Sequence, residues 1–449
     1  MRHLLNLAET KAILLPCIYR DFNYVGLIEA LKPDLPHLEH VIVMGEGVPS
    51  GMLSSNEVFR TPLEEKYPAD FLKQFRPGGD APRHLLCTSG TTGMPKISCW
   101  SENNTHAIFV QHGCRISMEL KENDIMAAIA PGNTASTGYG FAMLGPLCIG
   151  ATVATLERWD SGEALKLMER EKCSVGVMIP TQAIKLLGEE VEKYDLRHFT
   201  RLFNAGAQFP VENVKEFERR FHCQVLNCYG ATDAGAPFMI TVNDPAEKRW
   251  TTVGRTWDGE LKIVVDEKGT KAPVGQEGEI WWRGSDNMYG YVNDSERDAT
   301  SFTRDGFFRS GDVGFVDEEG YLHITGRIKD LIIRGGQNIS PREIEELLAA
   351  HPKILDVTVA AMPDPVYGER ACAFVVPRAG EKFTFEEMLS YLENQKIAKW
   401  KLPERLELIE EIPKSAGGKV MKRTLTEAIT EKLKQEGKLP ADFVPQVKV

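Results

Sequence analysis

A run of hydroxyl and glycine residues near position 90 is the segment best suited to hold a phosphate group. It reads TSGTTGMPK from position 88 to position 96 and directly follows the apolar residues HLLC. Hydroxyls and backbone N–H groups of such a loop can surround phosphate oxygens, and Lys96 supplies a positive point charge. Its Gly and Lys spacing differs from that of the common G-x-x-x-x-G-K-[ST] loop. We favour phosphate binding over an unliganded loop, and the candidate residues are Thr88, Ser89, Gly90, Thr91, Thr92, Gly93 and Lys96.

A carboxylate near position 233 could hold a metal ion beside a nucleotide. The segment YGATD, from Tyr229 to Asp233, follows the run CQVLNC, which has the composition of a buried strand. Open α/β sheets bind ligands at the carboxyl ends of their strands. Mg²⁺ usually takes only one or two protein carboxylates beside nucleotide phosphates, so one aspartate can suffice. Taken alone, this segment is better explained as a turn without a ligand.

An aspartate and an arginine farther along could bind a sugar. Asp312 ends the segment SGD, and Arg327 follows Gly326 in the segment GRIKD. A carboxylate that only accepts hydrogen bonds suits the paired hydroxyls of a ribose, and a guanidinium could add donors. Gly-Asp pairs are also common in hairpin turns, which is the plainer explanation of each segment by itself.

A lysine near the end of the chain lies in the turn-like segment PKSAGGK. Lys419 follows Gly417 and Gly418, so its side chain could reach a distant site from a flexible backbone. Considered in isolation, an exposed loop lysine is the favoured interpretation.

The composition narrows the class of protein. The chain has 449 residues, a formal net charge of −11, 42% apolar residues and 26% charged residues, which is typical of a globular protein with two or three domains. No run approaches the ~20 apolar residues of a membrane-spanning helix. The acidic balance argues against a nucleic-acid partner. Nine cysteines without C-x-x-C spacing favour a reducing compartment, so we expect a cytoplasmic protein.

The pattern of apolar runs predicts how these residues are positioned. From the start to about residue 240, short apolar runs, several of them β-branched, alternate with helical patterns, which is typical of βαβ units with mostly parallel sheets. From 241 to 328 the runs are short and broken by glycine, which predicts an antiparallel, barrel-like region with Trp281 and Trp282 in its core. A compact α+β piece follows. Its helix SPREIEELLAAHP has Ser340 and Glu343 at the spacing of a capping box.

The predicted fold class is therefore α/β. A large N-terminal domain, residues 1–328, consists of α/β sheets over 1–240 and a β-rich subdomain over 241–328. A small α+β domain, residues 329–449, follows it, and we expect this domain to be mobile about a hinge at Lys329.

Taken together and in this order, the four segments resemble the adenylate-forming superfamily of acyl-CoA synthetases, firefly luciferases and peptide-synthetase adenylation domains. The resemblance runs from about Lys11 to Arg423, and the loop at 88–96 matches the family's phosphate loop without a break. The stretch IIRGGQNISPREIEE is most like the acyl-CoA synthetase branch. The resemblance implies that ATP and Mg²⁺ activate a carboxylic acid to an acyl-adenylate, with release of pyrophosphate, and that coenzyme A then takes the acyl group.

The resemblance also implies residue roles. Asp312 and Arg327 resemble the ribose-binding pair, Lys329 falls at the family's hinge, and Lys419 resembles the catalytic lysine of adenylation. Thr232 and Asp233 are further catalytic candidates, with Asp233 as the metal ligand. The other residues implied to contact the nucleotide or coenzyme A are Gly206, Ala207, Gln208, Asn227, Tyr229, Gly230, Gly335 and Gly336.

Three departures from the family pattern stand out. Asp233 occupies a position where the family usually has Glu, so its carboxylate reaches one methylene less far. The stretch near the acyl pocket reads GNTAS over 132–136, where the family often has an aromatic residue or His. Less chain precedes the phosphate loop than in full-length members, so we expect a shortened first lobe. A fragment, a misplaced start and a short member that covers its exposed surface by association, such as a homodimer, are the open explanations.

The sequence leaves the substrate and the acceptor open. We expect the acyl pocket to draw on residues 133–141, 204–208 and 228–237, where Asp233 is the one charged residue. A mostly neutral acid, aromatic, alicyclic or medium-chain, would fit such a lining. The alternatives to coenzyme A transfer are transfer to the phosphopantetheine of a carrier protein, or a truncated protein that binds nucleotide with little turnover.

Overall fold

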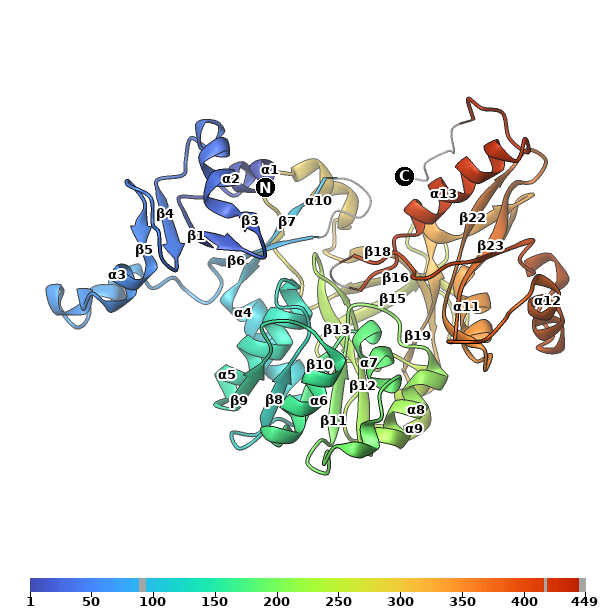
Figure 1. The fold of residues 1–449 in the computed structure, drawn as a ribbon, viewed down its shortest axis with the longest axis horizontal. Helices are drawn as coiled ribbons and strands as arrows, with labels where there is room; N and C mark the ends of the chain where they lie inside the picture. The colour runs from blue at the N-terminus through green and yellow to red at the C-terminus, as the bar shows by residue number, and fades with distance from the viewer. Residues whose placement is uncertain (89–93, 416–417, 444–449) are drawn as a thin grey trace. The chain divides into compact units, whose positions relative to one another are not determined.

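The computed structural model describes residues 1–88, 94–415 and 418–443 (Figure 1). Its contacts divide the chain into two compact units. One unit comprises Met1–Asn104 and Met288–Ala299, and the other comprises Thr105–Asn287 and Thr300–Val449. None of the helices within the described ranges has both the length and the apolar composition needed to cross a bilayer.

The first unit contains a small parallel sheet. Its strands are β1 (Ala12–Pro16), β4 (His40–Met44) and β5 (Leu53–Ser54), and they lie in the order β1-β4-β5. Helix α2 (Tyr24–Leu31) begins after Asn23, whose side chain accepts a hydrogen bond from the Gly26 N–H. Leu15, Val41 and Val43 of the sheet and Ile28 of α2 form a buried cluster. These elements agree with the alternation of strands and helices predicted for residues 1–240.

A hairpin in the same unit contains the candidate phosphate loop. Strands β6 (Pro82–Cys87) and β7 (Ile97–Ser101) are antiparallel, so the segment 88–96 joins their ends. The short strand β17 (Gly290–Tyr291) pairs with β7. The glycine-rich region after residue 241 thus contributes one strand to a sheet near the start of the chain, which its sequence pattern did not indicate.

The second unit is built on a seven-stranded sheet in the order β14-β13-β12-β11-β10-β8-β9. The strands from β9 to β12 are parallel to their neighbours, and β13 and β14 are antiparallel. The bounds are β8 (Ile125–Ala128), β9 (Thr152–Thr155), β10 (Val175–Met178), β11 (Arg201–Asn204), β12 (Gln224–Ala231), β13 (Gly235–Met239) and β14 (Arg255–Thr256). The mostly parallel sheet predicted for this region is confirmed.

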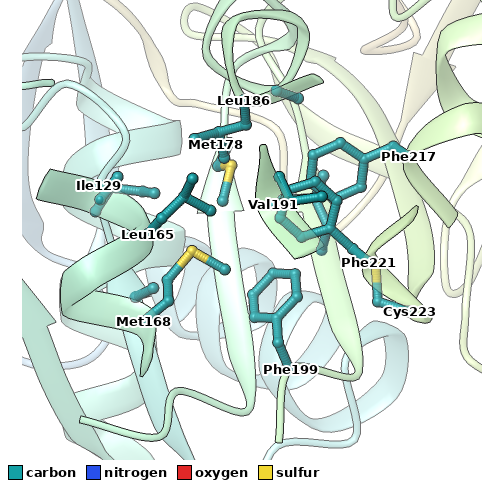
Figure 2. Close-up of a cluster of buried hydrophobic side chains, with 14 of the residues drawn as sticks. Ile129, Leu165, Met168, Met178, Leu186, Val191, Phe199, Phe217, Phe221 and Cys223 are labelled. Carbon is teal, nitrogen blue, oxygen red and sulfur yellow. The ribbon is translucent and has the colours of Figure 1, made fainter. Parts of the chain in front are cut away.

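Helices cover both faces of this sheet. On one face, apolar side chains of α6 (Ser161–Arg170), α7 (Pro180–Leu187) and α8 (Val211–Phe221) pack with Leu202 and Val225 of the strands (Figure 2). Successive strand side chains point to opposite faces, so Phe203 lies on the other face. There it contacts Phe141 of η5 (Ala135–Leu144), a helix that packs beside η4 (His106–Ser117).

An antiparallel sheet of four strands follows in the order β15-β16-β18-β19. Its core contains Trp282, whose indole N–H donates to the Ala234 carbonyl at 2.9 Å. Trp281 is also buried, so the prediction that both tryptophans belong to a core is confirmed. The bounds are β15 (Glu260–Val264), β16 (Gly278–Arg283), β18 (Phe308–Val316) and β19 (Leu322–Arg327).

The C-terminal part is a mixed sheet between helices, as the α+β prediction requires. Apolar residues of the sheet alternate between two clusters, one with α11 (Pro341–Ala349) and α12 (Phe385–Asn394) and the other with α13 (Lys422–Gln435). The strands are β20 (Ile332–Arg334), β21 (Gln337–Ile339), β22 (Ile354–Asp364), β23 (Gly368–Pro377) and β24 (Arg405–Leu408).

The predicted capping box of α11 is wrong in its hydrogen bonds. Ser340 is the N-cap residue, but its side chain makes no capping bond. The Ser340 hydroxyl donates to the Thr325 carbonyl of β19 at 2.6 Å, and Glu343 pairs with Lys401 at 2.6 Å. A tertiary partner for each side chain has replaced the local reciprocal bonds.

Candidate active site

The carboxyl ends of β10, β11 and β12 gather several candidate residues at one edge of the large sheet. The register pairs Met178 with Asn204 and Asn204 with Asn227, so the segments that follow these strands leave the sheet side by side. The candidate segments 204–208 and 229–233 are two of them. Ligands bind in open α/β sheets at this edge.

Asn227 and Asn204 form a buried amide pair near this edge. The Asn204 side-chain N–H donates to Asn227 Oδ1 at 3.0 Å, and Asn227 Nδ2 donates to the Arg249 carbonyl at 3.0 Å. The Asn227 side chain is therefore held by protein groups. Gly206 and Gln208 of the adjacent segment are exposed, and Ala207 is half-buried.

Asp233 lies in the turn that joins β12 to β13. The turn is tight, because a Cβ on Gly230 would lie 2.2 Å from the Gly235 carbonyl oxygen, and Gly235 has a φ of +91°. Thr232 and Asp233 are half-buried there. A half-buried carboxylate at the carboxyl end of a parallel strand fits a magnesium ion that a nucleotide largely coordinates, since such an ion needs only one or two protein carboxylates. No group of three His, Cys, Asp or Glu residues suited to a metal occurs among the described residues.

Asp312 is the centre of a small polar network. It is register-paired with Arg327 across β18 and β19, and Arg327 Nε lies 2.6 Å from Asp312 Oδ1. The Tyr229 hydroxyl donates to Asp312 Oδ2 at 2.6 Å. The Asp312 backbone N–H donates to the Ser310 hydroxyl at 3.0 Å, which holds the carboxylate in place. The structure thus joins the candidate nucleotide-binding residues Tyr229, Asp312 and Arg327.

The network shifts the ionisation of its members. Burial raises the pKa of Tyr229 well above its ordinary value, and the adjacent Asp312 carboxylate adds to this effect. Burial acts to lower the pKa of Arg327, but the carboxylates of Asp312 and Asp330 outweigh it, so the pKa of Arg327 is raised. Tyr229 is therefore a neutral donor and Arg327 a fixed cation.

Lys419 lies in a short hairpin, and the charges of this network change its pKa. Lys414 and Val420 form an antiparallel bridge, and the Ser415 N–H donates to the Lys419 carbonyl at 2.8 Å. Burial lowers the pKa of Lys419 to about 8, with further lowering by Arg327 and Lys329 against the opposing effect of Asp312. The charges of Arg327, Lys329 and Asp312 thus act on the near-terminal ammonium of Lys419.

The hairpin also touches the edge of the large sheet. A Cβ on Gly418 would lie 2.8 Å from Ile179 Cδ1, and Ile179 directly follows β10. A second contact joins the same regions, since Gln208 Nε2 donates to Glu346 Oε1 of α11 at 2.6 Å. Neither Ile179 nor Glu346 could be identified from local sequence patterns, because each lies far along the chain from its partner.

Two other predicted segments have clear positions. Lys329 belongs to the one-turn helix η7 (Ile328–Asp330), which links β19 to β20. Gly335 and Gly336 form the turn between β20 and β21 with φ values of +56° and +86°, and the Gly335 N–H donates to the Tyr367 carbonyl at 2.8 Å.

The candidate phosphate loop belongs to the first unit. The Lys96 N–H donates to Thr88 Oγ1 at 3.2 Å, and the Thr88 N–H donates to the Lys96 carbonyl at 3.0 Å. Lys96 Nζ lies 5.0 Å from the ring centroid of Tyr291. The remaining predicted residues of the loop lie outside the described residues; they are Ser89, Gly90, Thr91, Thr92 and Gly93.

Comparisons with known proteins agree on one family. The profile described as "AMP-binding enzyme" matches residues 1–292, and the profile described as "AMP-binding enzyme C-terminal domain" matches residues 343–419. The chain is 31% identical to a medium-chain fatty-acid–CoA ligase of Escherichia coli (strain K12) over 96% of its own length and 75% of that protein. It is 30% identical to a 2,3-dihydroxybenzoate-AMP ligase of Bacillus subtilis (strain 168), over 95% of this chain and 77% of that protein.

Solved structures lead to the same result. The crystal structure of ATP-bound MatB from Rhodopseudomonas palustris superposes with a TM-score of 0.82 at 25% identity, covering 96% of this chain and 81% of that one. The predicted resemblance and fold class are thus confirmed: the chain belongs to the family of AMP-binding enzymes.

Proposed function

We propose that this protein activates a carboxylic acid with ATP and transfers the acyl group to coenzyme A. The observation that carries the proposal is the network of Tyr229, Asp312 and Arg327, whose charges act on the half-buried Lys419. An acceptor carboxylate suits ribose hydroxyls, and a nearby ammonium suits a phosphate. Relatives named as acid–CoA ligases support the same activity.

The first half-reaction joins two anions. An oxygen of the acid's carboxylate attacks the α-phosphorus of ATP, a new P–O bond forms, and the bond to pyrophosphate breaks. The acid is already ionised at neutral pH, because carboxyl pKa values lie near ~4. The protein therefore needs no strong base, and its task is to position the reactants and offset their repulsion. Lys419 would lie between the carboxylate and the α-phosphate, and the loop at 88–96 would hold the other phosphates.

Magnesium would assist this step by neutralising charge on the polyphosphate. We assign Asp233 as its protein ligand, with Thr232 beside it. The half-buried turn at the carboxyl end of β12 supports this assignment. An aspartate reaches less far than a glutamate, so a bridging water between Asp233 and the ion is compatible with the turn.

In the second half-reaction the thiolate of coenzyme A attacks the acyl carbonyl, a thioester forms, and AMP leaves. The thiol needs the space near the adenylate, so Lys419 has to withdraw. We propose that residues 329–449 form a domain that turns about Lys329 and presents Gly335 and Gly336 to the pantetheine arm. The position of Lys329 in a one-turn link between two sheets supports a hinge there, since hinge motions are absorbed at a few residues between elements.

One observation favours an acceptor of the acyl group other than coenzyme A. A relative named as a 2,3-dihydroxybenzoate-AMP ligase is nearly as similar as the fatty-acid–CoA ligase. Transfer to a carrier-protein phosphopantetheine therefore remains the alternative, and thioester formation with coenzyme A against a holo-carrier protein separates the two. A nucleotide-binding protein with little turnover is the third possibility, which the exchange assay below tests directly.

We also propose a cellular location and an oligomeric state for the enzyme. All nine cysteines are free, which supports a reducing, cytoplasmic location. Exposed apolar side chains of the small parallel sheet, including Leu14 and Leu53, support association into a homodimer.

Exchange of labelled pyrophosphate into ATP across a panel of carboxylic acids tests the activity. We expect exchange that depends on an acid, on Mg²⁺ and on Lys419. Exchange with no acid in the panel, while ATP still binds, would contradict the proposal and favour the protein with little turnover.

A further inference from the structure

Three phenylalanine rings fill the space between the large sheet and the helices η4 and η5. Phe141 of η5 lies between Phe109 of η4 and Phe203 of β11, with ring centroids 5.0 Å and 4.6 Å apart. Each ring is no more than 2% exposed. This ring layer, defined as Phe109, Phe141 and Phe203, lies on the face opposite the cluster in Figure 2.

Glycines lock the ring layer in place. A Cβ on Gly140 would lie 2.2 Å from the Phe109 ring, and a Cβ on Gly113 would lie 2.6 Å from the Phe141 ring. The rings of Phe109 and Phe141 thus each pack directly on the backbone of the opposite helix. Protein interiors packed this closely do not admit an extra chain of methylenes without displacing side chains.

The layer lies just beneath the edge where the acid would bind. Phe203 immediately precedes Asn204, the first residue of the segment at the carboxyl end of β11. Helix η5 begins after Thr134, near the carboxyl end of β8, and Thr134 accepts a hydrogen bond from the Gly138 N–H. Phe141 lies two turns farther along this helix, at most roughly 10 Å from its start by the rise of a helix.

The residues above the layer are neutral and mostly small. The stretch from Asn133 to Gly140 carries hydroxyls and glycines, and it has no charged side chain. Such a lining suits an uncharged acyl group. The ring layer below it would limit how long that acyl group can be.

We propose that Phe141 closes the inner end of the acyl site and restricts the enzyme to compact carboxylic acids, such as aromatic or short aliphatic acids. This inference rests on the proposed function and narrows its substrate class. A medium-chain acid would have to displace a ring that two neighbouring rings and Gly113 hold. Phe141 is therefore a specificity-determining residue. It excludes acids whose chain is longer than the space between the reacting carboxylate and the Phe141 ring.

The test measures kcat/KM for pyrophosphate exchange with benzoate, butanoate, octanoate and dodecanoate. We expect the wild-type protein to prefer benzoate or butanoate. Phe141→Leu and Phe141→Ala should raise the ratio of octanoate to benzoate activity at least roughly tenfold, since differences of one or a few methylenes in a pocket discriminate by such factors.

Phe199→Leu is the matched control. Phe199 is 1% exposed and belongs to the cluster on the other face of the sheet. Its replacement by leucine therefore leaves a similar cavity in the core, away from the proposed acid site. It should lower stability without changing the ratio. Equal changes in the two variants would overturn the inference.

The wild-type measurement decides the matter even where the variants fail to fold. A wild-type preference for octanoate or dodecanoate overturns the role of Phe141 and leaves the proposed function standing. Exchange with no acid overturns the proposed function, and the inference falls with it.

Discussion

At the scale of single residues, the charge of Lys419 sets how the enzyme should respond to pH. Burial and the cations Arg327 and Lys329 hold the pKa of Lys419 at about 8. The ammonium form is the one that can offset the repulsion between the acid and ATP. A lysine with this pKa is charged below pH 8 and neutral above it.

We therefore expect kcat/KM for acid-dependent pyrophosphate exchange to fall as the pH rises through about 8. This parameter reports the ionisation of the free enzyme, before ATP binds near Lys419. In Lys419→Arg the guanidinium stays charged, so the rate is lower but the fall near pH 8 disappears. A wild-type profile that stays flat to pH 10 would contradict the role of Lys419.

Asp286 is a buried carboxylate for which the described residues provide no ion-pair partner. Both of its carboxylate oxygens lack a hydrogen-bond partner within the described part of the chain. Burial, and then the charge of Asp258, raise the pKa of Asp286 to about 7. The unfolded chain has an ordinary aspartate pKa near ~3.9. The folded state thus holds the proton more tightly, and stability is lost as the pH rises from about 4 to 7.

We predict that Asp286→Asn stabilises the protein at pH 8, by up to about 4 kcal/mol from the difference between the two pKa values, and has little effect at pH 4. Thermal unfolding at both pH values measures this. Asp258→Asn is the comparison, since it removes the second cause, together with the Asp258 contacts to His112 and Ser285, and should stabilise less at pH 8. A destabilised Asp286→Asn at pH 8 would show that the carboxylate has a partner in solution.

At the scale of elements, Ser340 connects the start of α11 to β19. Its hydroxyl donates to the Thr325 carbonyl at 2.6 Å and leaves the first turn of α11 without a side-chain cap. The bond joins two elements on either side of Lys329, so it acts on the geometry of the proposed hinge and not on helix propensity.

Ser340→Ala should lower the local stability at this junction by about 1 kcal/mol, the typical contribution of one hydrogen bond. Hydrogen exchange of β19 and the first turn of α11 should then become faster. Ser340→Thr keeps the hydroxyl and serves as the control. Faster exchange in α11 alone would instead indicate a lost helix cap.

At the scale of the whole molecule, the two half-reactions should separate by mutation. Lys419 would serve acyl-adenylate formation and withdraw before the thiol arrives. Lys419→Ala should abolish pyrophosphate exchange yet leave thioester formation from supplied acyl-adenylate largely intact. Single-turnover assays of each step measure this. Equal loss of both steps would refute the division of labour.

Lys414→Ala is a matched control for that experiment. Lys414 lies in the same hairpin, but its ammonium pairs with Asp356 at 2.6 Å. We expect Lys414→Ala to affect the stability of the hairpin and to slow both half-reactions to a similar, smaller extent.

Much of the fold could be predicted from local patterns. The strands that end at Asn204 and Ala231 contain short apolar runs, and α8 begins and ends where its helical spacing does. Since parallel strands end at one edge, the segments after them were expected to lie together. The family resemblance added the roles of Asp312 and Lys419, which spacing alone could not supply.

Tertiary structure decided the features that depend on distant partners. Three interactions join residues that no local pattern relates. They are the hydrogen bond from Tyr229 to Asp312, the contact of Gly418 with Ile179, and the hydrogen bond from Ser340 to the Thr325 carbonyl. The same holds for Asp286, whose ionisation depends on burial, and for Phe141, whose role depends on the rings around it. Periodicity and turn chemistry are properties of neighbouring residues, so the sequence determined the elements and the order of the motifs. Burial, charge and packing arise only when the elements meet, and they determine what each side chain can do.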